Sequence, residues 1–444
     1  MAAAALVAGV VAAQGAGSRA IPAGSHGVPV LIALRSGGHA NEAERAISAR
    51  GTATRVRERL ARAGFRETFR FSTLHALAGE IQGGDLRAAL SDPEVVGVDP
   101  DTGGGGGLRE SVPLVGARAL QDAGVTGRGV TVAVLDSGID ASHPDLGDDL
   151  VDEQCFCRNQ DGTGCCPGGL FQSSGPGAAR DDYGHGSWVS GVVTSAGRVA
   201  PRGVAPDAGI LAIKVLDAQN RFAASAQILA GLDWVLAARP DVRVVNMSLG
   251  TDELFEGRCD TSRSWTMAYA EAIGALRRRG VLVVAASMNS GSARRMAAPA
   301  CVASALAVGA TYDARHGALD WGTCRDAAGR ADQLVCFSNG GRGLDLLAPG
   351  ALIVTTAPGG GRTRALGGTS FAAPHVAGAA ALLLELSPSL TPGRIEAALE
   401  TTGPRVRDAR SGFVFPRLDV RAAAAAVSAR EYTVLLPPES AGRP

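Results

Sequence analysis

The segment Gly367-Gly-Thr-Ser370-Phe-Ala-Ala-Pro-His375-Val-Ala-Gly378 places a hydroxyl group at the start of an apolar, alanine-rich stretch. Apolar residues continue to Leu386, which predicts a buried helix over residues 371–386. A serine at a helix start is often only an N-cap. Here the two preceding glycines leave room for a second backbone, and the helix dipole favours negative charge that develops at this end. Ser370 is therefore a candidate nucleophile.

Two further segments place reactive side chains at structural junctions. In Val132-Ala-Val-Leu-Asp136-Ser-Gly-Ile-Asp140 an apolar strand pattern stops on a carboxylate, and in Gly184-His185-Gly186-Ser187 a small-residue helix opens with an imidazole. A serine hydroxyl needs an adjacent base, and a carboxylate can orient that base. Asp136, His185 and Ser370 thus provide the acid, base and nucleophile for acyl transfer.

Other carboxylates lie close to these positions in the sequence. Asp140 is the nearest rival to Asp136, but it lies in the turn after the strand rather than at the strand end. Asp181 and Asp182 directly precede the His185 segment, and we interpret both as exposed loop charges.

The three motifs resemble those of the subtilisin family of serine endopeptidases, which uses the same order of Asp, His and Ser. The resemblance extends to Gly203-Val-Ala-Pro206, Val245-Asn-Met-Ser-Leu-Gly250 and Ala285-Ala-Ser-Met-Asn289, and matching segments run from about Pro113 to Asp419. It implies a secreted serine endopeptidase that hydrolyses peptide bonds through an acyl-enzyme intermediate. It also implies synthesis as a precursor that processes itself.

Four runs are mostly apolar at consecutive rather than alternate positions, at residues 131–135, 210–215, 242–247 and 281–286. Such runs are typical of strands covered on both faces, as in a parallel sheet between two layers of helices. Residues 224–238 and 264–279 are suited to those helices. We therefore expect a subtilisin-like α/β catalytic domain over residues 111–430, with a mostly parallel central sheet and helices on both faces.

The resemblance also implies the substrate-binding residues. Asn289 matches the asparagine of the family's oxyanion hole, where the backbone N–H of Ser370 would be the second donor. Ser248, Leu249 and Gly250 match an edge that pairs with substrate as an added strand, and residues 219–223 would form the opposite edge. Met288 stands where the family usually has glycine, so we expect it to narrow the pocket for the side chain that precedes the scissile bond.

Residues 28–101 form a separate small α+β unit by their pattern. Strand-like stretches at residues 29–33, 68–82 and 95–98 alternate with helical patterns at residues 42–63 and 85–90. This βαββαβ order resembles the inhibitory propeptide of subtilisin-like proteases, which would act as an intramolecular inhibitor; an unrelated N-terminal domain is the alternative. Five consecutive glycines at residues 103–107 predict a flexible, cleavable linker over residues 102–110.

The ends of the chain and the cysteines indicate export. Residues 1–13 are an apolar run that fits a signal peptide within residues 1–20, although a basic residue near the start is missing, and residues 431–444 read as a tail. Eight cysteines lie in loops, which favours disulfides in an oxidising compartment. We expect Cys259–Cys301, Cys324–Cys336 and two bridges among Cys155, Cys157, Cys165 and Cys166. A zinc site at the last four is the alternative.

Composition and charge limit the partners. Basic and acidic residues balance at 43 each, so no long-range field favours nucleic acid or an anionic membrane. No segment reads as transmembrane, and we expect a monomer that acts on proteins or peptides. We assign no cofactor and no metal ligand. Asp145 matches a calcium ligand of some relatives, but the short loop over residues 194–202 favours a capped turn instead.

Two other functions compete with proteolysis. A non-catalytic binding module on the same fold would have a broken triad or oxyanion hole, and neither is evident. A serine esterase or lipase of another α/β fold would have a Gly-x-Ser-x-Gly elbow and the order Ser, Asp, His. The residues around Ser370 do not form that elbow, and the order here is different.

Overall fold

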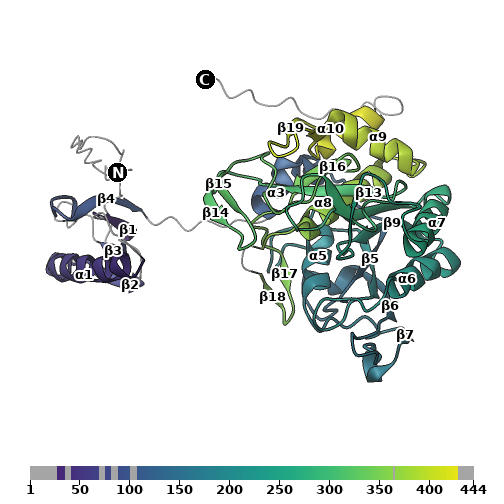
Figure 1. The fold of residues 1–444 in the computed structure, drawn as a ribbon, viewed down its shortest axis with the longest axis horizontal. Coiled ribbons are helices and arrows are strands. Elements are labelled where there is room, and N and C mark those ends of the chain that lie inside the picture. Colours follow the sequence, from purple (N-terminus) through teal and green to yellow (C-terminus); the bar gives the residue numbers. More distant parts are fainter. Residues whose placement is uncertain are drawn as a thin grey trace, which may run out of the picture. The chain divides into compact units, whose positions relative to one another are not determined.

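The computed structural model describes residues 28–35, 42–69, 76–81, 89–100, 108–363 and 366–428. The chain divides into two units, Met1–Gly104 and Gly105–Pro444 (Figure 1). The predicted signal peptide, the five consecutive glycines and the predicted tail lie outside the described residues. Helix α3 (Leu108–Leu114) begins inside the stretch predicted as linker, so its residues 108–110 are helical.

The first unit is an antiparallel sheet packed on a helix. Its elements are β1 (Val28–Leu34), α1 (Glu42–Ala61), β2 (Arg66–Phe69), β3 (Ala76–Ile81) and β4 (Val95–Pro100), and the sheet order is β2-β3-β1-β4. Ile32, Val56, Leu60 and Leu77 form part of one buried cluster between α1 and the sheet. The predicted strand over residues 68–82 contains the end of β2 and all of β3. Residues 85–88 of the predicted second helix lie outside the described residues.

The second unit is built on an eight-stranded sheet with the order β16-β13-β11-β9-β5-β8-β6-β7. All neighbours are parallel except β7, which runs antiparallel to β6. The strands are β5 (Thr131–Asp136), β6 (Leu150–Phe156), β7 (Gln172–Ser174), β8 (Gly209–Lys214), β9 (Val242–Met247), β11 (Leu282–Ala286), β13 (Leu306–Thr311) and β16 (Leu346–Pro349). The prediction of a mostly parallel sheet is confirmed.

Helices cover both faces of this sheet, which explains the continuous apolar runs. Along β5, Val132 and Val134 belong to the core under α5 (His185–Thr194) and α8 (Thr369–Leu386). The alternate residues Ala133 and Leu135 belong to the core under α6 (Ser225–Ala238) and α7 (Ser264–Arg278). Successive strand residues point to opposite faces, so a strand covered on both faces needs apolar residues at consecutive positions. Figure 1 shows these helices around the central strands.

Helix α8 runs through the middle of its layer. It packs against five neighbouring strands, β5, β9, β11, β13 and β16, and against α5. It is also long and apolar enough to cross a membrane by those two criteria alone. Because its side chains are buried in the core, the helix serves here as the central packing element.

All eight cysteines form disulfides, which confirms the expected bridges. Cys259 pairs with Cys301 and Cys324 pairs with Cys336. In the cluster Cys155 pairs with Cys166 and Cys157 with Cys165, so the four sulfurs are not zinc ligands. The two nested bridges fasten the loop that follows β6.

Candidate active site

The carboxyl ends of three adjacent strands bring the predicted site residues together. Asp136 is the last residue of β5, Ser248 follows the end of β9, and Asn289 lies just beyond β11. In the sheet these strands are neighbours in the order β11-β9-β5. Side chains beyond the carboxyl ends of parallel strands share one edge, where α/β proteins form their ligand sites.

Asp136 and His185 are directly hydrogen bonded. Nδ1 of His185 lies 2.7 Å from Oδ1 of Asp136, and the same oxygen accepts the backbone N–H of Ser137 at 2.7 Å. A carboxylate only accepts, so Nδ1 carries the proton and the lone pair is on Nε2. Burial of the imidazole disfavours its charged form, but Asp136 and, more weakly, Asp181 outweigh this effect and raise the pKa of His185 above its ordinary value.

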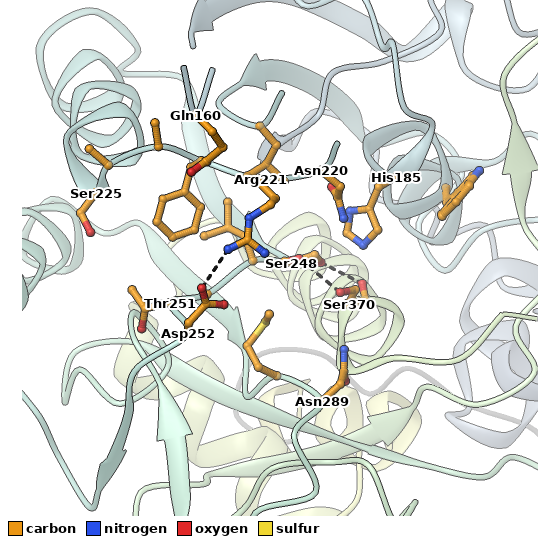
Figure 2. A pocket seen from close by; sticks show the side chains of 18 of the residues that line it. Gln160, His185, Asn220, Arg221, Ser225, Ser248, Thr251, Asp252, Asn289 and Ser370 are labelled. Atoms are coloured by element: carbon orange, nitrogen blue, oxygen red, sulfur yellow. Dashed lines mark hydrogen bonds and ion pairs between the residues drawn. The ribbon is translucent and has the colours of Figure 1, made fainter. Parts of the chain in front are cut away.

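Ser370 lies in the first turn of α8 and faces the same cleft as His185 (Figure 2). Its Oγ donates to the carbonyl of Ser248 at 3.2 Å, and Oγ of Ser248 donates back to the carbonyl of Ser370 at 2.8 Å. The ring of Phe371, the next residue, lies 6.3 Å from the ring of His185 between centroids. These contacts fix the start of α8 against the end of β9 and beside the imidazole.

Asn289 presents its amide N–H group to the cleft. Oδ1 of Asn289 accepts the backbone N–H of Thr369 at 2.8 Å and the Thr369 hydroxyl at 3.0 Å. Because a backbone N–H can only donate, these bonds assign the oxygen to the Thr369 side and leave Nδ2 as the free donor. The first N–H groups of a helix have no intrahelical partner, so the Ser370 N–H is a second donor of the same kind.

Met288 has an unusual backbone for its residue type. Its φ of 73° lies in the left-handed region, which glycine adopts without strain. The Met288 side chain lies against Gly250, since a β-carbon added to Gly250 would be 2.7 Å from Cγ of Met288. Both residues line the cleft, together with Ser248 and Leu249. The structure therefore brings all four predicted substrate-binding residues to one wall.

The cleft has a volume of about 910 Å³ and extends well beyond the reactive groups. The predicted opposite edge contributes Asn220, Arg221 and Phe222, and the disulfide-fastened loop after β6 contributes Gln160. Arg221 and Asp252, which belong to the two edges, form an ion pair at 2.8 Å (Figure 2). An ion pair of two exposed side chains thus links the two edges of the cleft.

Asp140 does not take part in the site. Oδ1 of Asp140 accepts the Ser142 backbone N–H and hydroxyl, and Oδ2 accepts the N–H of Gly359. The interpretation of Asp181 and Asp182 as exposed loop charges needs correction. Asp181 is partly buried and accepts hydrogen bonds at the start of α5, and Asp182, although exposed, pairs with the buried Lys214.

Asp145 is hydrogen bonded to the loop that follows α5. Its buried carboxylate accepts the backbone N–H groups of Arg198, Val199 and Ala200 at 2.6–2.9 Å. These donors contact both carboxylate oxygens. Within the described residues, no group of three or more His, Cys, Asp or Glu side chains is arranged to hold a metal ion.

Comparisons with known proteins agree with this geometry. The sequence model of the subtilase family matches residues 127–418. Subtilisin BL of Lederbergia lenta is 37% identical over 298 residues, which cover 66% of this chain and 91% of that protein. The alkaline protease of Alkalihalobacillus alcalophilus is 35% identical over 337 residues, or 75% of each chain.

Two solved protease structures have a similar fold. A cold adapted subtilisin-like serine proteinase aligns with a TM-score of 0.50 and 28% identity, over 66% of this chain and 89% of that one. A protease from Pseudoalteromonas arctica shares the fold, with a TM-score of 0.56 and 24% identity over 71% and 94% of the two chains. The chain therefore belongs to the subtilase family of serine endopeptidases.

Proposed function

We propose that Ser370 is the nucleophile of this endopeptidase, His185 its general base and then general acid, and Asp136 the carboxylate that orients His185. The observation that carries the proposal is the hydrogen bond of 2.7 Å between Asp136 and His185, in a cleft that Ser370 and Asn289 also line. This arrangement argues against the non-catalytic binding module, which would lack one of these groups.

The reaction follows from the positions of these groups. Ser370 Oγ turns from the Ser248 carbonyl toward Nε2 of His185, gives up its proton there and attacks the carbonyl carbon of the peptide bond. Negative charge then develops on the carbonyl oxygen, where Nδ2 of Asn289 and the N–H of Ser370 donate. The protonated His185 passes its proton to the leaving amine, and water later hydrolyses the acyl-enzyme in the reverse sequence.

Substrate binding would also prepare the nucleophile. A peptide that adds as a strand along Ser248, Leu249 and Gly250 offers N–H groups to their carbonyl oxygens. An N–H bound to the Ser248 carbonyl competes with the Ser370 hydroxyl for that oxygen. The hydroxyl is thereby released toward His185 when the cleft is filled.

Met288 would limit the size of the side chain before the scissile bond. Its side chain occupies the space beside Gly250, which a glycine at position 288 would leave open. We therefore assign preferred substrates with small or medium side chains at that position. Peptide libraries with strong preference for large aromatic residues there would contradict this assignment.

We further propose that the enzyme is exported and matures by cutting itself. Four disulfides support an oxidising compartment, and the α+β unit over residues 28–100 supports an inhibitory propeptide. Protein and peptide chains would be the substrates of the mature enzyme, which we expect to be a monomer.

One experiment tests the catalytic assignment and the maturation together. The secreted wild-type protein should lose its precursor segment and react at Ser370 with a sulfonyl fluoride, as seen by intact-mass and peptide mass spectrometry. Purified Ser370→Ala should remain uncut and unlabelled, whereas Ser248→Ala keeps the nucleophile and should still be labelled. Proteolysis by Ser370→Ala would overturn the catalytic assignment, and processing of purified Ser370→Ala would overturn self-cleavage.

A further inference from the structure

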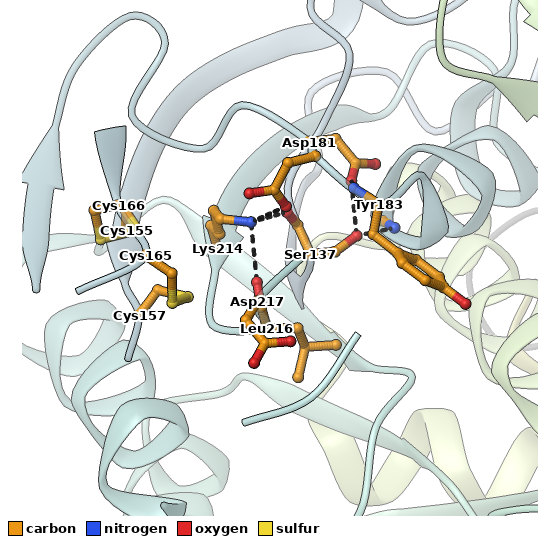
Figure 3. Close-up of polar contacts among 12 residues, drawn as sticks. Ser137, Cys155, Cys157, Cys165, Cys166, Asp181, Tyr183, Lys214, Leu216 and Asp217 are labelled. Atoms are coloured by element: carbon orange, nitrogen blue, oxygen red, sulfur yellow. Dashed lines mark hydrogen bonds and ion pairs between the residues drawn. A yellow bond between two sulfur atoms is a disulfide. The ribbon is translucent and has the colours of Figure 1, made fainter. Parts of the chain in front are cut away.

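A second carboxylate lies behind the Asp136–His185 pair and has no place in the mechanism above. Asp181 accepts five hydrogen bonds at the start of α5. Figure 3 shows Asp181 beside Ser137 and Tyr183. Oδ1 accepts from the Ser137 hydroxyl and the N–H groups of Tyr183 and Gly184, and Oδ2 accepts from the N–H and hydroxyl of Ser187, at 2.6–3.1 Å.

Asp181 supplies what the helix start lacks. The N-cap residue of α5 is Gly184, which has no side chain to satisfy the free N–H groups of the first turn. A carboxylate near a helix N-terminus also interacts favourably with the helix dipole. The first residue of this helix is His185, so Asp181, which binds the start of the helix, also fixes the position of the imidazole.

Ser137 connects that anchor to the strand that bears Asp136. The Ser137 hydroxyl donates to Asp181 at 2.9 Å and accepts the N–H of Gly186 at 2.9 Å. A second connection runs from the N–H of Asp140 to the hydroxyl of Ser187, at 2.9 Å. The residues that follow Asp136 are therefore fastened to the residues that flank His185 in the sequence.

A buried lysine, Lys214, binds the backbone of Ser137 and the carboxylate next to Asp181. Nζ of Lys214, which is 1% exposed, donates to the carbonyls of Ser137 and Leu216 and to Oδ1 of Asp182, at 2.8, 3.0 and 2.6 Å. The two adjacent acids are thus divided between two tasks: Asp182 neutralises the buried ammonium, and Asp181 binds the helix.

We propose that Asp181 is a positioning residue, which joins the end of β5 to the start of α5 and adds a second negative charge behind the imidazole. The proposal rests on the catalytic roles assigned above. Its function goes beyond capping, because the same carboxylate fixes both partners of the Asp136–His185 bond.

The effect of the Asp181 charge on His185 can be distinguished from the effects of the other charged groups around α5. Among the described residues, the elements packed against α5 carry four titratable groups: Asp136 on β5, Lys214 on β8, and His375 and Glu385 on α8. Glu385 lies in the last turn of α8, where it accepts the N–H groups of Thr126 and Gly127, and β17 (Thr356–Ala357) carries no titratable group. Lys214 is paired with Asp182, and burial lowers the pKa of His375 to about 4, so His375 is neutral at pH 7. Asp136 and Asp181 are the two carboxylates that raise the pKa of His185.

The test compares Asp181→Asn with Asp140→Asn, which removes a nearby charge that makes no contact with His185. In the first variant we expect the acid limb of the kcat/KM profile for a peptide anilide to move to lower pH by roughly half a unit or more. We expect kcat to fall by about 10- to 100-fold with KM within about twofold of the wild type. Asp140→Asn should keep the midpoint of the wild type.

Ser137→Ala tests the positioning role without changing the charge. It also provides a test if Asp181→Asn does not fold. It should lower kcat by about tenfold or more and leave the midpoint in place. Wild-type kcat in Ser137→Ala, or an unmoved or raised midpoint in Asp181→Asn, would overturn the proposal. Ser370→Ala distinguishes the positioning role of Asp181 from the catalytic roles proposed above. Activity in Ser370→Ala would refute the catalytic roles. If Ser370→Ala is inactive and only the results expected for Asp181→Asn and Ser137→Ala are not observed, the positioning role alone is refuted.

Discussion

Thr369 holds Asn289 by two hydrogen bonds to a single oxygen, one from its backbone N–H and one from its hydroxyl. The amide of Asn289 therefore has one orientation before substrate arrives. Donors fixed in advance need no reorganisation when the oxyanion forms, which makes them effective in catalysis. This relationship leads to the first prediction.

Asn289→Ala should lower kcat by about 100- to 1,000-fold with little change in KM, the range known for loss of this donor in subtilisin. The donor acts on charge that exists only in the transition state, so ground-state binding is spared. Steady-state kinetics with a peptide anilide measures both constants. An effect that fell mainly on KM would instead assign Asn289 to substrate binding.

Thr369→Val tests whether the orientation of Asn289 matters by itself. The substitution removes the hydroxyl and preserves the shape of the side chain, and it leaves the backbone N–H bond in place. We expect kcat to fall by roughly tenfold, since the hydroxyl's bond to Asn289 is lost together with the bond that it accepts from the N–H of Met288. Thr369→Ser retains the hydroxyl and is the matched control. Equal kcat in both variants would show that the backbone N–H alone fixes the amide.

Asp136→Asn should lower kcat by about 10,000-fold at neutral pH. This is the size of the effect of the equivalent Asp→Asn substitution in the catalytic triad of a serine protease with another fold. An asparagine amide stabilises the wrong imidazole tautomer and no longer favours the charged form. Because Asp136 raises the pKa of His185, the acid limb of the remaining activity should move to lower pH. A pH profile of kcat/KM from pH 4 to 9 measures this shift, and movement to higher pH would contradict the assignment.

The fold and the main site residues were accessible from the sequence because their signals are local. The predicted strand over residues 242–247 and the observed β9 have the same bounds, since burial on both faces requires an apolar run of that length. Asp136, Ser248 and Asn289 follow such runs, and the parallel arrangement then places them at one edge of the sheet.

The residues that the sequence did not reveal act through partners far along the chain. Asp181 appears in the sequence as one of two adjacent loop acids, and its partners become visible only when Ser137 and the start of α5 are brought beside it. Lys214 had a local signal, a cation inside the apolar run 210–215. Its three acceptors are set by tertiary structure.

Met288→Gly should broaden substrate choice. Glycine adopts the φ of 73° without strain, and the space beside Gly250 becomes available. The ratio of kcat/KM for a peptide with Phe before the scissile bond to that for the matched peptide with Ala should rise by about 10-fold or more, because each methylene accommodated is worth 10- to 200-fold. The Ala peptide controls for general effects on catalysis. An unchanged ratio would show that Met288 does not limit the pocket.

The last prediction concerns stability and a carboxyl group far from the active site. Glu400 lies on α9 (Pro392–Thr402), where burial and the nearby carboxylates of Asp345 and Glu396 raise its pKa to about 7. In the unfolded chain the ordinary value is about 4.5. The folded state therefore binds this proton more tightly. Its contribution to stability is full below about pH 4.5 and is lost as the pH rises through 7.

Glu400→Gln removes the charge that the fold disfavours, so it should stabilise the protein at pH 8 and have little effect at pH 4.5. After allowance for partial exposure to water, we expect about 1–2 kcal/mol at pH 8. The free energy of unfolding in urea, measured at both pH values in the Ser370→Ala background to prevent self-digestion, gives the difference. Glu271→Gln on the exposed side of α7 is the same substitution without burial, and should change neither value. Stabilisation of equal size at both pH values would show that the ionisation of Glu400 does not cause it. Only the loss of an ionising group makes the change in the free energy of unfolding depend on pH.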